Sequence, residues 1–334
     1  MSMRIRVKAG AALAIFTVGA MLAGPVAAQS AAGAANYPNK PIKLIAPFAA
    51  GGVADVMARL VGDKLSKSMG TPVIVENRPG AGGNIGADVV AKAEPDGYTL
   101  LMASAGIVSI NGSLYPKLSF DPVNGFAPVS LVADMPMVVV VSSSVRAKTL
   151  SEFIQYAKEN EDKVFFSSPG NGTTGHLGME LFQRAANIKI THVPYKSGAE
   201  SVGAVVSGTL AGSVDNPPSV IPQMKSGKVQ ILAVAAKQRL PQLPDVPTAS
   251  EAGLPGFEVS SWFGIVAPAK TPQAIIDRLS AETAKALNEP DVVQRLAALG
   301  VRGVGNQPAE FDTFIKSERV KWDGLVKRAN IRLE

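Results

Sequence analysis

Short apolar runs alternate with amphipathic stretches along most of the chain, from residue 37 to its end. Short runs rich in β-branched side chains and bounded by turn residues are typical of buried strands. Stretches in which apolar residues recur at every third or fourth position are typical of helices that bury one face. We therefore expect strands at residues 42–47, 73–76, 98–103, 137–141, 164–167, 189–193, 210–214, 229–235 and 257–267. Helices are expected at residues 52–69, 85–93, 150–158, 174–186, 200–207, 218–225, 272–287, 291–299 and 308–327.

This alternation predicts an α/β protein with mainly parallel sheets. Residues 237–255 break the pattern with four prolines and Gly253, so we expect a surface loop there. Two sets of strands and helices, followed by a helical tail, predict two lobes. In such folds the ligand binds beyond the carboxyl ends of strands, where loops enter helices, so we expect a cleft between the lobes.

A secretory leader is predicted at residues 1–28. Arg4, Arg6 and Lys8 precede an apolar run at residues 9–23, and small residues favour cleavage after Ala28. The run is shorter than the ~20 residues of a spanning helix. We expect the mature protein to be soluble and outside the cytoplasm; an uncleaved anchor is the alternative.

Composition removes several classes of function. The absence of cysteine excludes disulfides, thiolate metal sites, a cysteine nucleophile and a lipid anchor on a cysteine at the cleavage point. The net charge of +6 would be halved by loss of the leader, which contains three basic and no acidic residues. The other basic residues are mixed with acidic ones and only 6% of residues are aromatic, which argues against nucleic-acid binding.

Two loops that follow strands are suited to an anion. The first is Phe48, Ala49, Ala50, Gly51 and Gly52, before the helix expected at 52–69. Small residues allow a ligand close to the backbone, and the first N–H groups of a helix have no intrahelical partner. An ordinary tight turn is the alternative interpretation.

The second loop precedes the helix expected at 174–186. Its candidate residues are Ser168, Gly170, Asn171, Gly172, Thr173, Thr174 and His176. The glycine spacing also matches G-x-G-x-x-G, but no acid ends the next strand where a nucleotide ribose would need one. We therefore interpret this loop as a second anion-receiving turn.

Further candidates lie at other strand ends. Ser104 and Ala105 follow one strand, Tyr195 follows another, and Asp215 with Asn216 follows a third. An acid in Asp215's position is as often a helix cap as a ligand contact. Asp55 lies in the first turn of its helix, where a cap or a contact to water or an amine is expected rather than a contact to an anion.

No motif supports catalysis or a cofactor. The two histidines, His176 and His192, lack the spacing of a helical metal site, and there is no G-x-S-x-G elbow or phosphate-binding P-loop. The sequence therefore predicts a binding protein with no metal, no cofactor and no catalytic residues. A carboxylate pair brought together only by folding would make the rival, a secreted hydrolase.

Several long segments resemble one family of receptors. YPNKPIKLIAPFAAGGVADVMAR (37–59), VIVENRPGAGGNIGADVVAKAEPDGYTLL (73–101) and HVPYKSGAESVGAVVSGTLAGSVDNPPSVIPQMKSGKVQILAV (192–234) are similar to the Bug-type receptors of tripartite tricarboxylate transporters. So is LPDVPTASEAGLPGFEVSSWFGIVAPAKTP at 243–272. VENRPGAGG and PDGYTL are the most specific of these matches.

The resemblance implies a periplasmic-binding-protein fold, in which two α/β lobes are joined by two crossover segments and close on a ligand. Residues 37–138 with 258–334 would form the first lobe and residues 139–257 the second. The crossovers would lie near 135–141 and 257–266, and both loops described above would hold a carboxylate.

The resemblance also implies a function. The protein would be a monomeric periplasmic receptor that captures a small organic acid for the permease subunits of a tripartite transporter. A ligand-binding input module for a signalling partner is the alternative.

Overall fold

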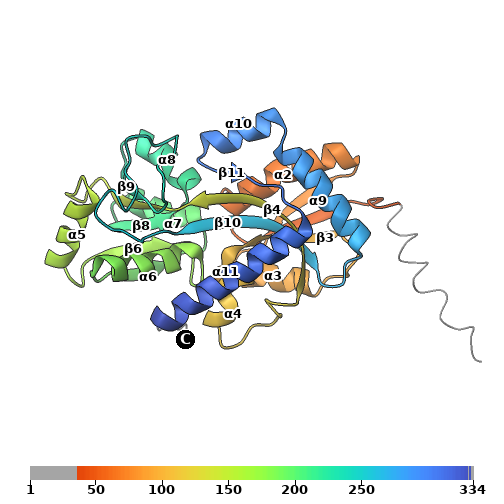
Figure 1. Ribbon diagram of the computed structural model, residues 1–334, viewed down its shortest axis with the longest axis horizontal. Coiled ribbons are helices and arrows are strands. Elements are labelled where there is room, and N and C mark those ends of the chain that lie inside the picture. Colours follow the sequence, from red (N-terminus) through yellow and green to blue (C-terminus); the bar gives the residue numbers. More distant parts are fainter. Residues whose placement is uncertain (1–35, 330, 332–334) are drawn as a thin grey trace, which may run out of the picture. The chain divides into compact units, whose positions relative to one another are not determined.

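The computed structural model describes residues 36–329 and residue 331. The leader expected at residues 1–28 and its cleavage point lie outside these residues. Residues 38–329 form two β-sheets, each with its own helices. Figure 1 shows α5–α8, within residues 150–225, beside one sheet. It shows α2 (Val53–Met69), α3 (Asn84–Ala91), α9 (Gln273–Leu287) and α11 (Pro308–Ala329) beside the other.

The first sheet has six strands in the order β11-β4-β10-β3-β1-β2. Its strands are β1 (Ile42–Ala46), β2 (Val73–Asn77), β3 (Thr99–Ser104), β4 (Phe126–Pro136), β10 (Ser260–Pro268) and β11 (Arg302–Gly303). The second sheet has five strands in the order β7-β6-β8-β5-β9. These are β5 (Val138–Ser142), β6 (Phe165–Ser168), β7 (Thr191–Pro194), β8 (Gly212–Asp215) and β9 (Val229–Val234).

Helices connect the strands and cover the sheets. They are α2 (Val53–Met69), α3 (Asn84–Ala91), α4 (Asn111–Leu114), α5 (Leu150–Glu159), α6 (Thr174–Ala186), α7 (Gly198–Val206), α8 (Pro217–Lys225), α9 (Gln273–Leu287), α10 (Pro290–Ala298) and α11 (Pro308–Ala329). Two short irregular turns add to them, a 3₁₀ helix η1 (Ala81–Gly83) and a π-helix η2 (Gly106–Ile110). Residues 237–255 contain neither a helix nor a named strand, as expected from their prolines.

The α/β fold class with two sheets is confirmed, but the expectation of mainly parallel sheets is wrong. Pairing is parallel within β1, β2 and β3 and within β6, β7 and β8. The strands β4, β5, β9, β10 and β11 pair antiparallel with their neighbours. Four of the five antiparallel pairings involve β5 or β10, the two strands that directly follow a crossing between the sheets and that run against the strands of the βα units beside them.

Two crossing segments join the sheets near the predicted positions. Pro136, the last residue of β4, is followed by Met137 and then by β5, while the chain returns between β9 and β10. The segments are hydrogen-bonded to each other: Met137 N–H donates to Val259 O at 2.8 Å, Val259 N–H to Ala235 O at 3.0 Å, and Ala235 N–H to Met137 O at 2.8 Å. Met137, Ala235 and Val259 thus form a short backbone ladder where the chain crosses between the sheets, and this ladder is called the hinge.

The C-terminal helices pack on the first sheet. Helix α11 lies against β4 and η2, and α9 lies against β4 and α2. The carboxylate of Glu318 on α11 accepts the indole N–H of Trp262 at 3.1 Å and of Trp322 at 2.9 Å, and all three side chains are buried. This carboxylate thereby fixes α11 to β10.

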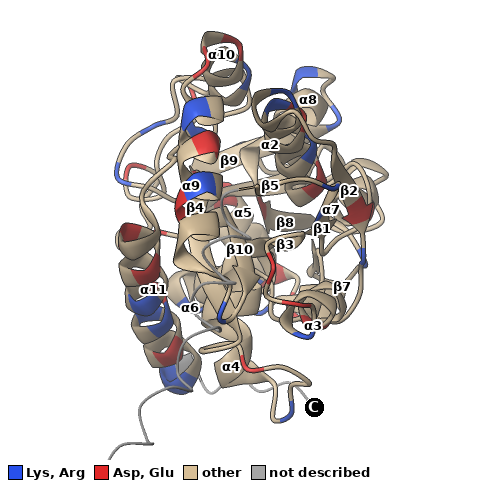
Figure 2. Cartoon of the chain, turned by 90° about the vertical axis from the view of Figure 1, so that its right-hand side faces the viewer, with Lys and Arg blue, Asp and Glu red and all other residues tan. Residues whose placement is uncertain are grey.

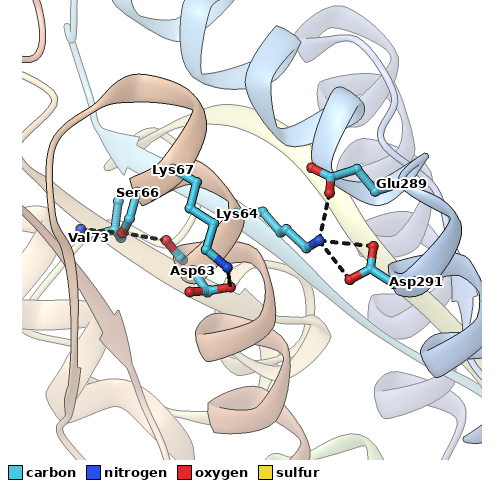
Figure 3. A network of polar contacts seen from close by, with 8 residues as sticks. Asp63, Lys64, Ser66, Lys67, Val73, Glu289 and Asp291 are labelled. Carbon is cyan, nitrogen blue, oxygen red and sulfur yellow. Dashed lines mark hydrogen bonds and ion pairs between the residues drawn. The ribbon is translucent and has the colours of Figure 1, made fainter.

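A lysine joins α2 to the start of α10. Figure 3 shows Lys64 reaching from α2 between Glu289 and Asp291, with Nζ 2.6 Å from Glu289 Oε2 and 2.7 Å from Asp291 Oδ2. The carboxylates of Asp291 and Glu289 raise the pKa of Lys64. The C-terminal segment is thus held against the N-terminal part of the first sheet by charge as well as by apolar packing.

Basic and acidic residues are interspersed on the surface. Figure 2 shows blue and red segments alternating along α9 and α11, and several of these residues form ion pairs one helical turn apart. This face therefore presents no continuous basic stripe. No helix within residues 36–329 combines the length and apolar character needed to cross a bilayer.

Candidate functional site

A cavity lies between the two sheets. It encloses about 530 Å³ of space free of protein atoms, part of it open to solvent. Its walls come from both sides of the hinge: Phe48, Gly52, Val53, Ala54, Ser104, Ser261 and Phe263 around the first sheet, and Pro169, Thr173, Thr174, Gly175, Gly198, Asp215, Asn216 and Ser219 around the second, with Met137 between them.

Four helices begin at this cavity, and three of them, α2, α6 and α7, have an N–H group at each position of the first turn, whereas α8 opens with Pro217 and Pro218. Gly52, the N-cap of α2, has no side chain to satisfy the first turn, and Val53 and Ala54 of that turn line the cavity. Thr174 and Gly175 begin α6, and Gly198 begins α7. First-turn N–H groups have no intrahelical acceptor and carry the positive end of the helix dipole. These helix starts therefore place partial positive charge at a cavity that has no basic side chain in its lining.

Among the described residues that line the cavity there is no Lys, Arg or His. The neutral hydrogen-bonding side chains of the lining are Thr173, Thr174, Asn216 and three serines, Ser104, Ser219 and Ser261. The only ionisable lining residue is Asp215. An anion would accordingly be held by main-chain N–H groups and hydroxyls.

In the first loop, Asp55 supports the backbone from behind. Its Oδ2 accepts the Gly51 N–H at 2.9 Å, its Oδ1 accepts Asn77 Nδ2 at 2.9 Å, and Arg59 pairs with both oxygens. Burial alone would raise the pKa of Asp55, but the hydrogen bonds from Arg59, Gly51 and Asn77 outweigh it and hold the pKa below its ordinary value. Gly51 has φ +82°, which favours glycine.

Asp55 does not line the cavity, and its hydrogen bond from Gly51 holds the residue that precedes the N-cap of α2. Of the first-loop candidates, Phe48 and Gly52 line the cavity, whereas Ala49, Ala50 and Gly51 do not.

The second loop is held by its own hydroxyls. Thr173 Oγ1 donates to Gly170 O at 2.7 Å and accepts the His176 N–H at 3.4 Å, which caps α6. The Ser168 hydroxyl accepts the Gly170 N–H at 3.1 Å. Thr173 and Thr174 line the cavity, while Ser168, Gly170, Asn171 and Gly172 shape the loop behind it.

The two histidines stack behind this loop, with ring centroids 4.2 Å apart. His176 Nδ1 accepts the Gly172 N–H at 3.3 Å, so its proton lies on Nε2, and His192 Nε2 is 2.6 Å from the Ser168 hydroxyl. Burial lowers the pKa of His176 to about 4, and burial followed by the charge of His176 lowers the pKa of His192 to about 3. Both rings are neutral at neutral pH and support the loop.

Asp215 and Asn216 end β8 at the cavity wall. Asp215 is 1% exposed, and its Oδ1 accepts the Asn216 N–H at 2.7 Å. Burial raises the pKa of Asp215 to about 7, against the opposing effect of that N–H. The capping alternative does not apply, because Pro217 and Pro218 have no N–H and the Ser219 N–H donates to Asn216 O.

The remaining candidates divide between two places. Ser104 lines the cavity, and Ala105 is buried next to it in the chain. Tyr195, Gly170 and Asn171 line a neighbouring groove, which shares Phe48 and Pro169 with the cavity.

The second loop contacts the segment that contains η2 and α4. Tyr115 Oη donates to Asn171 O at 3.1 Å. Gly106, at the start of η2, approaches Gly172 so closely that a Cβ on Gly106 would lie 2.9 Å from Gly172 O. The second loop is therefore in direct contact with elements of the first sheet.

Sequence reasoning missed part of the lining. Val53, Ala54, Gly175, Gly198 and Ser219 are in the first turns of helices whose starts were predicted, and the helix-start signal extends to them. Met137, Pro169, Ser261 and Phe263 had no such signal; Met137 lies on a crossing segment, and Ser261 and Phe263 lie on β10, which follows the other. Within residues 36–329 no cluster of three His, Asp or Glu residues is arranged to hold a metal ion.

Comparisons with known proteins give a consistent result. Residues 57–331 match the model of the tripartite tricarboxylate transporter family receptor. Protein BugT of Bordetella pertussis is 36% identical over 325 residues, which cover 97% of this chain and 98% of BugT.

Two solved structures have the same fold. That of R. palustris Rpa4515 with adipate is 33% identical, with a TM-score of 0.87, and covers 89% of this chain and 100% of its own. That of MatC from Rhodopseudomonas palustris with bound malate is 35% identical, with a TM-score of 0.83, and covers 87% and 100%.

Proposed function

Because the chain belongs to the tripartite tricarboxylate transporter receptor family, we propose that it is a monomeric periplasmic receptor that captures a small organic acid, unchanged, for the permease subunits of such a transporter. The observation that carries the acid specificity is the convergence of the first turns of α2, α6 and α7 on one cavity whose lining has no basic side chain.

The energetics agree with a carboxylate ligand. A hydrogen bond to a charged group contributes about 1.5–3 kcal/mol, and a micromolar dissociation constant corresponds to about 8 kcal/mol. Three or four N–H or hydroxyl donors from the helix starts, offset by desolvation and association costs, supply that order of affinity. The two similar structures, which hold adipate and malate, favour aliphatic dicarboxylates as the first acids to test.

We also propose the lobe boundaries and the route of export. Residues 37–138 with 258–334 form the first lobe and residues 139–257 the second, and the leader at residues 1–28 directs the chain to the periplasm. The hydrogen-bonded crossing segments support this division, because they lie where the two sheets meet.

A pair of substitutions at Gly52 tests the site. Gly52 lines the cavity, has φ −76°, and has no atom closer than 3.4 Å to an added Cβ. Asp and Asn are both favourable N-caps, so Gly52→Asp and Gly52→Asn should both fold. Only the former places a negative charge at the start of α2.

Calorimetric titration with adipate and malate should show at least tenfold weaker binding by Gly52→Asp than by Gly52→Asn, since a carboxylate at position 52 would repel a carboxylate bound at the same helix start. Equal affinities of the two variants for an acid that binds the wild type would contradict the proposed site. No binding of either acid by the wild type would contradict the dicarboxylate assignment.

A further inference from the structure

The carboxyl group of Asp215, if ionised, is unfavourable in a cavity proposed to receive an anion. It is the only ionisable group in the described lining and is 1% exposed. One oxygen accepts the Asn216 N–H, and the other, Oδ2, has no hydrogen-bond partner among the described residues. A buried, ionised carboxylate with a free oxygen is costly, and a second negative charge beside it adds to the cost.

No neighbouring charge offsets that cost. The strands β5, β6 and β9 carry no ionisable residue, and the helices packed around β8 do not pair with Asp215. Their charged or titratable residues are His176, Glu180 and Arg184 on α6, Glu200 on α7 and Lys225 on α8. Across the cavity, Arg59 on α2 is engaged by Asp55. Within the described residues, Asp215 forms no ion pair, and its one hydrogen bond is to Asn216.

We propose that Asp215 is a neutral carboxylic acid in the ligand-bound receptor, so that capture of an organic acid takes up one proton at Asp215 and is stronger in mildly acidic solution. This inference rests on the proposed function, because it requires an anionic ligand in the cavity. The proton comes from solvent and adds to the Asp215 carboxylate, and the ligand remains a carboxylate. The protonated group also becomes a hydrogen-bond donor that an ionised aspartate lacks.

Protonation is accessible near neutral pH. Burial raises the pKa of Asp215 to about 7, so both forms are populated in the range in which the protein works. If only the protonated form admits the ligand, the apparent affinity is reduced by the protonated fraction. That fraction falls on the order of tenfold between pH 6 and pH 8, and the affinity should fall with it.

Calorimetric titration of the mature protein with adipate and malate at pH 6, 7 and 8 tests this. We expect about tenfold weaker binding at pH 8 than at pH 6 and, at pH 8, uptake of one proton, measured from the heat in two buffers of different ionisation enthalpy. Asp215→Asn, which is neutral at every pH, should vary less than twofold and take up no proton, and it also reports any titration of the ligand itself. Asp245→Asn, the same change at an exposed aspartate, should retain the tenfold dependence.

Binding that does not change with pH and takes up no proton in the wild type would overturn the proton-uptake inference and leave the proposed function standing. If neither acid binds at any pH, the dicarboxylate assignment fails. Infrared difference spectra of wild type against Asp215→Asn then decide the protonation state. A protonated-carboxyl band present at pH 6 and lost at pH 8 supports a neutral Asp215, and its absence at pH 6 overturns it.

Discussion

Replacing Gly106 by alanine tests whether η2 and the second loop touch when the receptor holds its ligand. The new Cβ would lie 2.9 Å from Gly172 O, closer than such atoms approach without a shift, and the opposing atom is backbone and cannot rotate away. Gly106 lies in the helical turn η2 and has no positive φ, so alanine is compatible with the local backbone. The strain therefore falls on the contact between η2 and the second loop.

Overpacking of this kind costs about 1–3 kcal/mol, which corresponds to roughly 5- to 150-fold weaker binding. If η2 and the second loop approach this closely only when ligand is bound, binding of adipate or malate in calorimetric titration should be weaker, with little change in the melting temperature of the ligand-free protein. Gly203→Ala is the matched control: Gly203 lies on α7 with no atom within 4 Å of an added Cβ. If Gly106→Ala binds these acids as tightly as the wild type, η2 and the second loop must lie apart in the bound state, which would refute the predicted contact.

Three further substitutions are tested by urea or thermal unfolding. Glu318→Ala leaves the indole N–H groups of Trp262 and Trp322 buried without an acceptor and should lower the free energy of unfolding by about 2–5 kcal/mol, whereas Glu318→Gln should cost less; a loss below ~1 kcal/mol would contradict this. Burial raises the pKa of Asp215 in the folded protein, so as the pH rises above 4 the unfolded chain loses this proton first. The free energy of unfolding should therefore fall by up to about 4 kcal/mol by pH 7. Asp215→Asn should remove this dependence on pH, and a dependence that persists in the variant would count against the prediction. Lys64→Met should lower the melting temperature, with a difference from wild type that shrinks in salt; no difference at low salt would mean that the ion pairs contribute nothing.

Much of the fold was predictable because it rests on local periodicity. The βα units of both sheets have short apolar strands followed by amphipathic helices, and the predicted ranges agree with the observed elements to within a few residues. Strand β4 was missed. Pro128, Asp134 and Pro136 interrupt its apolar pattern, and this strand is stabilised by long-range pairing with β10 and not by its own sequence.

The candidate site was predictable where a helix begins and unpredictable where the chain crosses between sheets. Gly52 and Thr174 follow from the rule that helix starts receive anions, and the structure places both at the cavity. Met137 and Phe263 reach the cavity only because two distant segments meet at the hinge, which no local pattern encodes. Asp55 and Asp215 are both acids near the start of a helix, so sequence alone does not distinguish their environments. Only the three-dimensional structure places Asp55 behind the loop and Asp215 at the cavity wall.

Strand β10 has a consequence for the order in which the chain folds. It lies between β4 and β3 in the six-stranded sheet, yet it follows all five strands of the second sheet along the chain. A chain that emerges from its N-terminus can pair β1, β2 and β3, but β4 has no neighbour until residues 260–268 arrive. Pairings over such separations are slow, because a long loop must close before any contact forms. The second sheet can therefore form while β1–β3 and β4 are still unpaired with each other. The first sheet can be completed only after the last quarter of the polypeptide has been synthesised.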